Sequence, residues 1–118
     1  MARKFLHVGC VTQDKNFPGL NYNPILDCYC SDPSANEHNI EWLYFPETSP
    51  LLKTAISKMT HIAYMVDDLD AAVAGKEMVL EPIEVGPGFK IAFFFEDGAL
   101  VENCQAGCND NCGCGCQK

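Results

Sequence analysis

The most restrictive feature of this chain is a short pattern that occurs twice. Residues 5–14 and 59–68 each place a histidine, a β-branched residue and a tiny residue before an apolar stretch and acidic or amide side chains. Residues 40–43 and 101–104 form a second matching pair, each with a glutamate after a β-branched residue. The order of a histidine segment followed by a glutamate segment therefore repeats, which predicts an internally duplicated domain.

The repeated segments are rich in strand-forming residues, and the regions between them predict an α+β domain of two β-α-β-β-β-like modules. The second module has a helix capped by Asp67 and Asp68 and ended by Gly75. The first module is short of its helix, because residues 15–24 contain two prolines and a glycine and show no helical periodicity. Ser49 and Pro50 begin a connector helix. The predicted units are modules 1–48 and 59–104, connector helix 49–58, and tail 105–118.

The predicted strands and helix of the two modules follow from alternation of apolar residues and from turn residues. They are strands 5–12, 25–30 and 39–45 in the first module, and strand 60–66, helix 69–74 and strands 78–83, 90–95 and 99–104 in the second.

The two histidines and two glutamates of the repeat are candidate metal ligands: His7, Glu41, His61 and Glu102. Strand alternation gives each glutamate apolar neighbours on its own face, and a buried carboxylate needs a partner. Pseudo-symmetric strands can bring all four side chains to one divalent cation. Imidazole and carboxylate together suit Zn, Ni, Co, Mn or Fe(II). Taken singly, each residue is also compatible with a surface position or with a hydrogen-bonded place in the core.

Small residues accompany both histidines on the same strand face. Gly9 follows His7 by two positions and Ala63 follows its counterpart by two, which we interpret as space beside the metal. Alternation also places Phe5 on the face of His7. His38 precedes the first glutamate by three residues and points to the opposite face of a strand, so we do not expect it to be a ligand.

These residues resemble the vicinal oxygen chelate superfamily, which includes glyoxalase I, methylmalonyl-CoA epimerase, extradiol dioxygenases and the bleomycin- and fosfomycin-resistance proteins. The resemblance spans roughly residues 5–104 and rests on His-Val-Gly at 7–9, Ile-Glu at 40–41, and Val-Glu at 101–102. The stretch 61–72 is similar to the opening of the family's second module. The sequence before it looks like the connector of the epimerase branch, so the epimerase and glyoxalase I branches are the nearest.

The resemblance implies a curved mixed sheet whose concave side holds a divalent metal. The ligands would be the four residues named above, with Glu102 or Glu41 also acting as general base. The implied activity is that of an isomerase or lyase, which removes a proton next to a metal-bound carbonyl of a small carbonyl acid or thioester. The shortened first module and the cysteine tail are departures from the family pattern. The alternative is a non-catalytic protein that binds a metal or a ligand.

Five of the eight cysteines lie at or beyond the end of the last predicted strand, and their spacing is C-x3-C-x3-C-x-C-x-C: Cys104, Cys108, Cys112, Cys114 and Cys116. Short Gly- and Asn-containing loops of this kind resemble thiolate clusters that bind Zn or Cu(I). A reduced tail without metal, and disulfide or redox use, are the alternatives. Cys28 and Cys30 share a strand face and can join such a cluster, or serve as ordinary core or edge residues. We expect Cys10 to pack on the side away from His7.

The formal net charge of −8 argues against nucleic-acid binding, which needs clustered Lys and Arg, and against binding to an anionic membrane. The longest strongly apolar run, residues 91–95, is far shorter than the ~20 residues that span a bilayer. We therefore expect a cytoplasmic protein that acts on a small molecule. Phe93, Trp42 and Tyr44 are expected on the convex side of the sheet, where exposed apolar area predicts a symmetric homodimer.

Overall fold

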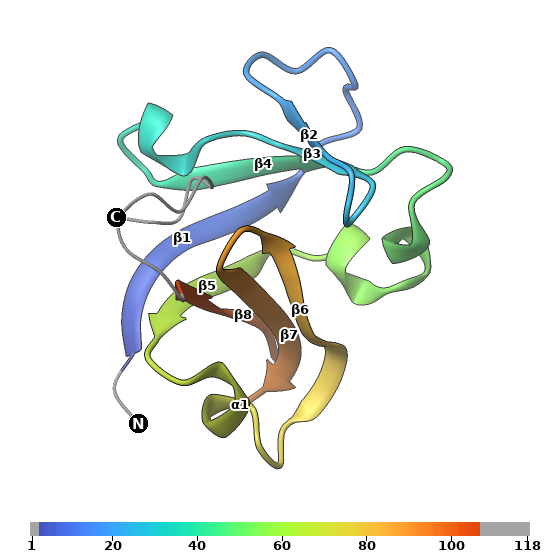
Figure 1. Ribbon diagram of the computed structural model, residues 1–118. Coiled ribbons are helices and arrows are strands. Elements are labelled where there is room, and N and C mark those ends of the chain that lie inside the picture. Colours follow the sequence, from blue (N-terminus) through green and yellow to red (C-terminus); the bar gives the residue numbers. More distant parts are fainter. Residues whose placement is uncertain (1–2, 107–118) are drawn as a thin grey trace.

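The two histidine segments form the central pair of strands in a curled mixed sheet (Figure 1). The computed structural model describes residues 3–106, which contribute eight strands in the order β2-β3-β4-β1-β5-β8-β7-β6. The strands are β1 (Arg3–Val11), β2 (Asn21–Asn23), β3 (Cys28–Cys30), β4 (Ile40–Tyr44), β5 (His61–Val66), β6 (Glu77–Gly86), β7 (Phe89–Glu96) and β8 (Ala99–Ala106). The result is a half-barrel dominated by strands.

The strand directions agree on the two sides of the central β1–β5 junction. β1 and β5 are antiparallel to each other, and each has a parallel neighbour on its outer side, β4 for β1 and β8 for β5. Beyond these neighbours, β3 and β2 on one side and β7 and β6 on the other continue in antiparallel pairs. The histidine and glutamate strands are therefore adjacent in each half.

The helices of the described chain are short. α1 (Leu69–Ala72) begins at Asp68, whose carboxylate accepts a hydrogen bond from the Ala71 backbone N–H. It ends two residues before the expected Ala74. The expected connector helix is instead two 3-10 turns, η2 (Pro50–Lys53) and η3 (Ala55–Ser57), because the extended backbone of Thr54 interrupts it.

The first half differs most from the expected strands. No helix forms in the described segment 12–20, in agreement with the sequence. The expected strand 25–30 is shortened to β3, because the Asn23 side chain accepts hydrogen bonds from the backbone N–H groups of Ile25 and Leu26 and turns the chain. Asn21–Asn23 pairs with β3 as an additional strand. A 3-10 turn before β4, η1 (Pro33–Ala35), was not expected.

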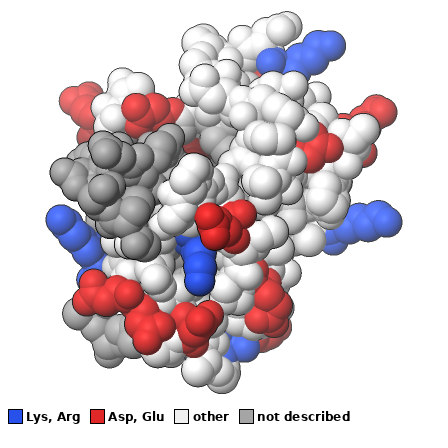
Figure 2. Space-filling view, in the orientation of Figure 1, with Lys and Arg blue, Asp and Glu red and all other residues white. Residues whose placement is uncertain are grey.

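The sheet curls far enough to bring its two edges together. The Asn23 side-chain amide on β2 donates a hydrogen bond to the Val85 carbonyl oxygen on β6, at 3.3 Å. The main core fills the concave side, while a smaller core lies beneath α1 on the convex side. Of the described residues, no helix is long and apolar enough to cross a membrane. Figure 2 shows acidic side chains at several places on the face drawn.

A bulge in β1 changes the expected face of one residue. Phe5 pairs with Tyr64, whereas His7 pairs with Ala63, so the register shifts between Phe5 and His7. Because Tyr64 and Ala63 point to opposite faces, Phe5 also points away from the face of His7. The expectation that Phe5 shares the histidine's face was wrong; its ring packs edge-on against Tyr64 and is half exposed.

Candidate metal centre

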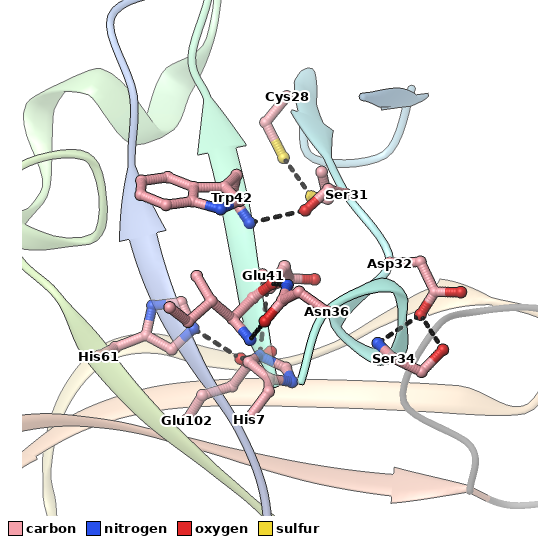
Figure 3. Close-up of polar contacts among 12 residues, drawn as sticks. His7, Cys28, Ser31, Asp32, Ser34, Asn36, Glu41, Trp42, His61 and Glu102 are labelled. Atoms are coloured by element: carbon pink, nitrogen blue, oxygen red, sulfur yellow. Dashed lines mark hydrogen bonds and ion pairs between the residues drawn. The ribbon is translucent and has the colours of Figure 1, made fainter. Parts of the chain in front are cut away.

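Four side chains from four different strands converge on the concave side of the sheet (Figure 3). His7 comes from β1, Glu41 from β4, His61 from β5 and Glu102 from β8. One nitrogen or oxygen atom of each lies within 4.8 Å of the corresponding atom of every other. We call these residues the four-residue cluster. The structure therefore brings together the four residues that the repeat singled out.

Two adjacent rows of paired residues, each running across three strands, explain how side chains from strands that are not neighbours can meet. In one row Gly9 lies between Glu41 and His61, and in the next Ala63 lies between the other histidine and glutamate. Neighbouring strands are about 4.8 Å apart, so side chains two strands away from each other are normally separated by about twice that distance. A small central residue and a curled sheet allow the two outer side chains to lean over the middle strand.

Gly9 is required by the imidazole that lies over it. A Cβ atom at this position would be 2.0 Å from Cε1 of His61, which is far inside van der Waals contact. The space at Gly9 is therefore filled by the ring of the opposite histidine. The expectation that the space at Gly9 is left open beside a metal was wrong in this detail, because the His61 ring leans across β1 toward the other three side chains of the cluster.

The contacts within the cluster are short and almost entirely buried. Nε2 of His7 is 3.1 Å from Oε1 of Glu41 and 3.4 Å from Oε1 of Glu102, and Nε2 of His61 is 3.0 Å from the same Glu102 oxygen. Burial by itself raises the pKa of Glu102, but the two imidazoles outweigh it and lower the pKa to about 2. Glu102 is therefore an ionised carboxylate held between two histidines.

The two carboxylates have different surroundings. Glu102 contacts both histidines and its side chain is 7% exposed, whereas Glu41 contacts His7 alone and is 15% exposed. Glu41 is thus the less enclosed member of the cluster.

The chemistry of the cluster fits a divalent cation. Among the described residues, neither ring nitrogen of His61 has a hydrogen bond of acceptable geometry, and neither has Oε1 of Glu102. Buried polar atoms rarely lack such partners. Nε2 of His61 and Oε1 of Glu102 lie 3.0 Å apart without the hydrogen-bond angle, as expected of two atoms directed at a common centre. Two imidazoles and two carboxylates are a suitable donor set for a divalent transition metal.

A cavity of about 440 Å³ opens beside the cluster, within the range of small-molecule sites. Both glutamates line it. Its apolar wall includes Leu43, Phe45, Leu51, Phe89, Ile91 and Phe93, and its polar side includes Asn21, Tyr22, Asn23, Ser31 and Asp32. No Lys, Arg or His is found among the described residues of the lining.

Phe93 is a site residue that the sequence argument misplaced. It pairs with Glu102 across β7 and β8, is 3% exposed, and packs edge-on against His61 with ring centroids 4.9 Å apart. The expectation that it lies exposed on the convex side was wrong. The alternation of side chains within the two glutamate strands does not show which face of the sheet Phe93 occupies on β7. Only the pairing register between β7 and β8 fixes that face.

The other residues singled out are not members of the four-residue cluster. His38 is exposed. Cys104 is buried in β8, on the concave side with Glu102, and Cys10 is half buried. Cys108, Cys112, Cys114 and Cys116 lie outside the described residues.

No family model and no curated protein matches the sequence. A search of solved structures finds a similar fold in the hypothetical protein BH1468 from Bacillus halodurans C-125, with a TM-score of 0.59 and 18% sequence identity. The match covers 89% of this chain and 95% of that one. At this identity the likeness concerns the fold alone. The curled mixed sheet is compatible with a vicinal oxygen chelate fold, and the buried cluster could hold a metal ion.

Proposed function

We propose that this chain is a divalent-metal-dependent isomerase or lyase of the vicinal oxygen chelate superfamily, which removes a proton next to a carbonyl group. The observation that carries the proposal is the buried four-residue cluster at the wall of a ligand-sized cavity. Matching strand directions in the two halves support two modules of common design, 1–48 and 59–104. The sequence resemblance favours the epimerase and glyoxalase I branches.

The metal would be held by His7, Glu41, His61 and Glu102, and Zn, Ni, Co, Mn and Fe(II) all suit this donor set. When bound, it would supply Lewis-acid stabilisation of the negative charge that develops on a carbonyl oxygen. We propose that Glu102 is the carboxylate that stays bound to the metal, because it faces both histidines and is more buried than Glu41.

Glu41 is the better candidate for the base that takes the proton. It lines the cavity, contacts a single histidine and is the more exposed of the two carboxylates. A general base must reach the substrate C–H within hydrogen-bond range, and a carboxylate with fewer contacts can turn toward it at lower cost. The apolar wall that includes Phe89 and Ile91 would exclude water from this proton transfer.

The charge of the cavity narrows the class of substrate. Its lining has three carboxylates, Asp32, Glu41 and Glu102, and none of its described residues is cationic. A free carboxylate or phosphate inside the cavity would lack a positively charged partner other than the metal. We therefore favour an uncharged carbonyl compound or the acyl part of a thioester. A carbonyl acid fits only if its carboxylate is itself one of the groups on the cation.

Hydrogen–deuterium exchange tests this function without knowledge of the substrate. Full-length protein with reduced thiols is loaded with Mn, Co, Ni or Zn and incubated in D₂O with hydroxyketones, ketoaldehydes, carbonyl acids and acyl thioesters, and NMR follows the C–H next to each carbonyl. We expect metal-dependent exchange that is fastest for uncharged compounds. Glu41→Gln should abolish exchange. If no compound exchanges faster with loaded protein than with free metal, the enzymatic proposal is wrong.

A non-catalytic binding protein is the second candidate, because the first half is reduced. β2 and β3 have three residues each, and no helix lies in the described segment 12–20. A metal-loaded protein that binds members of the same panel in calorimetry but exchanges none would support this candidate. In this second candidate, the cysteine tail would also bind Zn or Cu(I).

A homodimer remains a proposal. Trp42 and Tyr44 are half buried, and they pack against Phe17 and Tyr29 of the same chain. Phe5, by contrast, is 50% exposed on β1. Light scattering with reduced thiols should give twice the 13.0 kDa chain mass, and a single-chain mass over a range of concentrations would exclude the dimer.

A further inference from the structure

Two cysteines outside the four-residue cluster face the same cavity. Cys28 and Cys30 lie on either side of Tyr29 in β3, both line the cavity, and their sulfur atoms are 3.7 Å apart. Figure 3 labels Cys28 and draws its sulfur contact as a dashed line. Cys28 is buried and Cys30 is half buried. Side chains two residues apart on a strand share a face, but here their rotamers also bring the sulfur atoms together.

We propose that Cys28 and Cys30 form a second site, which takes a single thiophilic cation of the zinc group through both sulfur atoms. Two thiolates that bind one zinc ion at about 2.3 Å with a tetrahedral angle lie about 3.7–3.8 Å apart. The observed separation already matches this spacing. The pair therefore needs little rearrangement to bind such an ion.

The surroundings select soft cations and leave room for further ligands. The pKa of Cys30 is raised well above its usual range, by the contact with Cys28 first, then by burial and by the negative charge of Glu41. Because both donors are sulfur atoms, the pair favours ions with high affinity for sulfur over Mg²⁺ or Mn²⁺. Both cysteines line the cavity, so water or a small thiol from the cavity could complete the coordination of an ion held there.

The two sites differ in the ions that they prefer. The four-residue cluster offers only nitrogen and oxygen and so suits Mn²⁺, whereas the dithiol offers only sulfur. The dithiol and Glu41 line one cavity, so a cation at the sulfur pair would also offset negative charge beside the cluster. The dithiol proposal is independent of the proposed enzyme activity.

The test uses full-length protein in which Cys108, Cys112, Cys114 and Cys116 are replaced by serine, so that the tail cannot bind the probe. The protein is saturated with Mn²⁺ and titrated with Cd²⁺, and the ultraviolet thiolate-to-cadmium charge-transfer band is recorded. We expect a single cadmium ion per chain, with a band of two-thiolate intensity, while the electron paramagnetic resonance signal of bound Mn²⁺ persists.

Matched variants assign the band to its sulfur atoms. Cys30→Ser and Cys28→Ser should each lose most of the band, whereas Cys10→Ser should retain it. Because Cys28 is buried and its replacement can disturb folding, the half-buried Cys30 gives the decisive variant, with retained Mn²⁺ binding as the check on its fold. The proposal is overturned if the parent protein shows no band, if the band survives Cys30→Ser, or if it is lost on Cys104→Ser instead.

Discussion

The two halves of the sheet contribute the same pair of side chains but enclose them differently. In the half formed by β5–β8, the strands beyond the histidine strand are eight to ten residues long. In the half formed by β1–β4, the outer strands β2 and β3 have three residues each. The long half packs apolar side chains around its histidine and glutamate, and the short half supplies the polar side of the cavity.

In the proposed enzyme, this difference would separate the carboxylate that holds the metal from the carboxylate that reaches a substrate. Glu102 is buried between both histidines, whereas Glu41 contacts only His7 and is more exposed. A fold with two similar halves can thus use one half to enclose a site and the other half to leave it open. The small residue of each row differs as well, with glycine in the short half and alanine in the long half.

The largest expected effect comes from exchanging these small residues. Gly9→Ala should abolish tight metal binding, because its Cβ would be 2.0 Å from the His61 ring and would displace it. Ala63→Gly is the matched change in the other half. It should retain metal binding and cost only about 0.5–1 kcal/mol of unfolding free energy. Metal calorimetry and urea unfolding measure both effects, and wild-type affinity in Gly9→Ala would contradict the role given to the glycine.

The two carboxylates should separate metal affinity from turnover. Glu102→Gln should weaken metal binding by more than the roughly 10- to 100-fold that loss of an outer-shell partner costs, because Glu102 faces both histidines. Glu41→Gln should bind metal more tightly than Glu102→Gln and still lose exchange activity. Equal losses of affinity in the two variants would remove the distinction between the halves.

Low pH should destabilise the metal-free protein because it protonates Glu102, which lies in the long half. The pKa of Glu102 is lowered to about 2 from an ordinary value of 4.5, so the ionised carboxylate adds stability above about pH 4.5. That stability is lost as the pH falls from about 4.5 toward 2. Urea unfolding in the presence of a chelator should therefore show a flatter acid limb for Glu102→Gln than for wild type. An unchanged limb would show that Glu102 is not the carboxylate responsible.

The smallest expected effect concerns a surface link between the halves. Glu96 on β7 contacts Lys76 at 2.5 Å and Arg3 of β1 at 3.1 Å, and Lys76 first, then Arg3, lowers the pKa of Glu96. Glu96→Gln should cost less than about 1 kcal/mol, because exposed ion pairs contribute little. Salt should reduce the difference from wild type. A cost of several kcal/mol would mean that this link, rather than the shared concave core, joins the halves.

Local sequence patterns were sufficient to find the four strands whose histidine and glutamate side chains converge. Alternation within β1, β4, β5 and β8 and the repeated order of histidine and glutamate indicated which side chains can meet. The cap at Asp68 was also readable from local chemistry. These features depend on residues that are close together in the sequence, so a single amino-acid sequence is enough to predict them.

Features that depend on long-range register were not readable. The face of Phe93 follows from pairing between β7 and β8, and the role of Gly9 follows from its place opposite His61. The shift between Phe5 and His7 arises from a bulge that no local signal marks. The cavity results from the curl of the whole sheet and from the approach of Asn23 to Val85.

X-ray absorption spectroscopy of the manganese-loaded, full-length protein tests the central claim most directly. The claim is that one divalent ion is bound by two imidazoles and two carboxylates from the two halves. The manganese edge should show nitrogen and oxygen neighbours only, with the outer-shell scattering of two imidazoles, and His61→Ala should release the ion. A spectrum with sulfur neighbours, or one with no imidazole scattering, would contradict the claim.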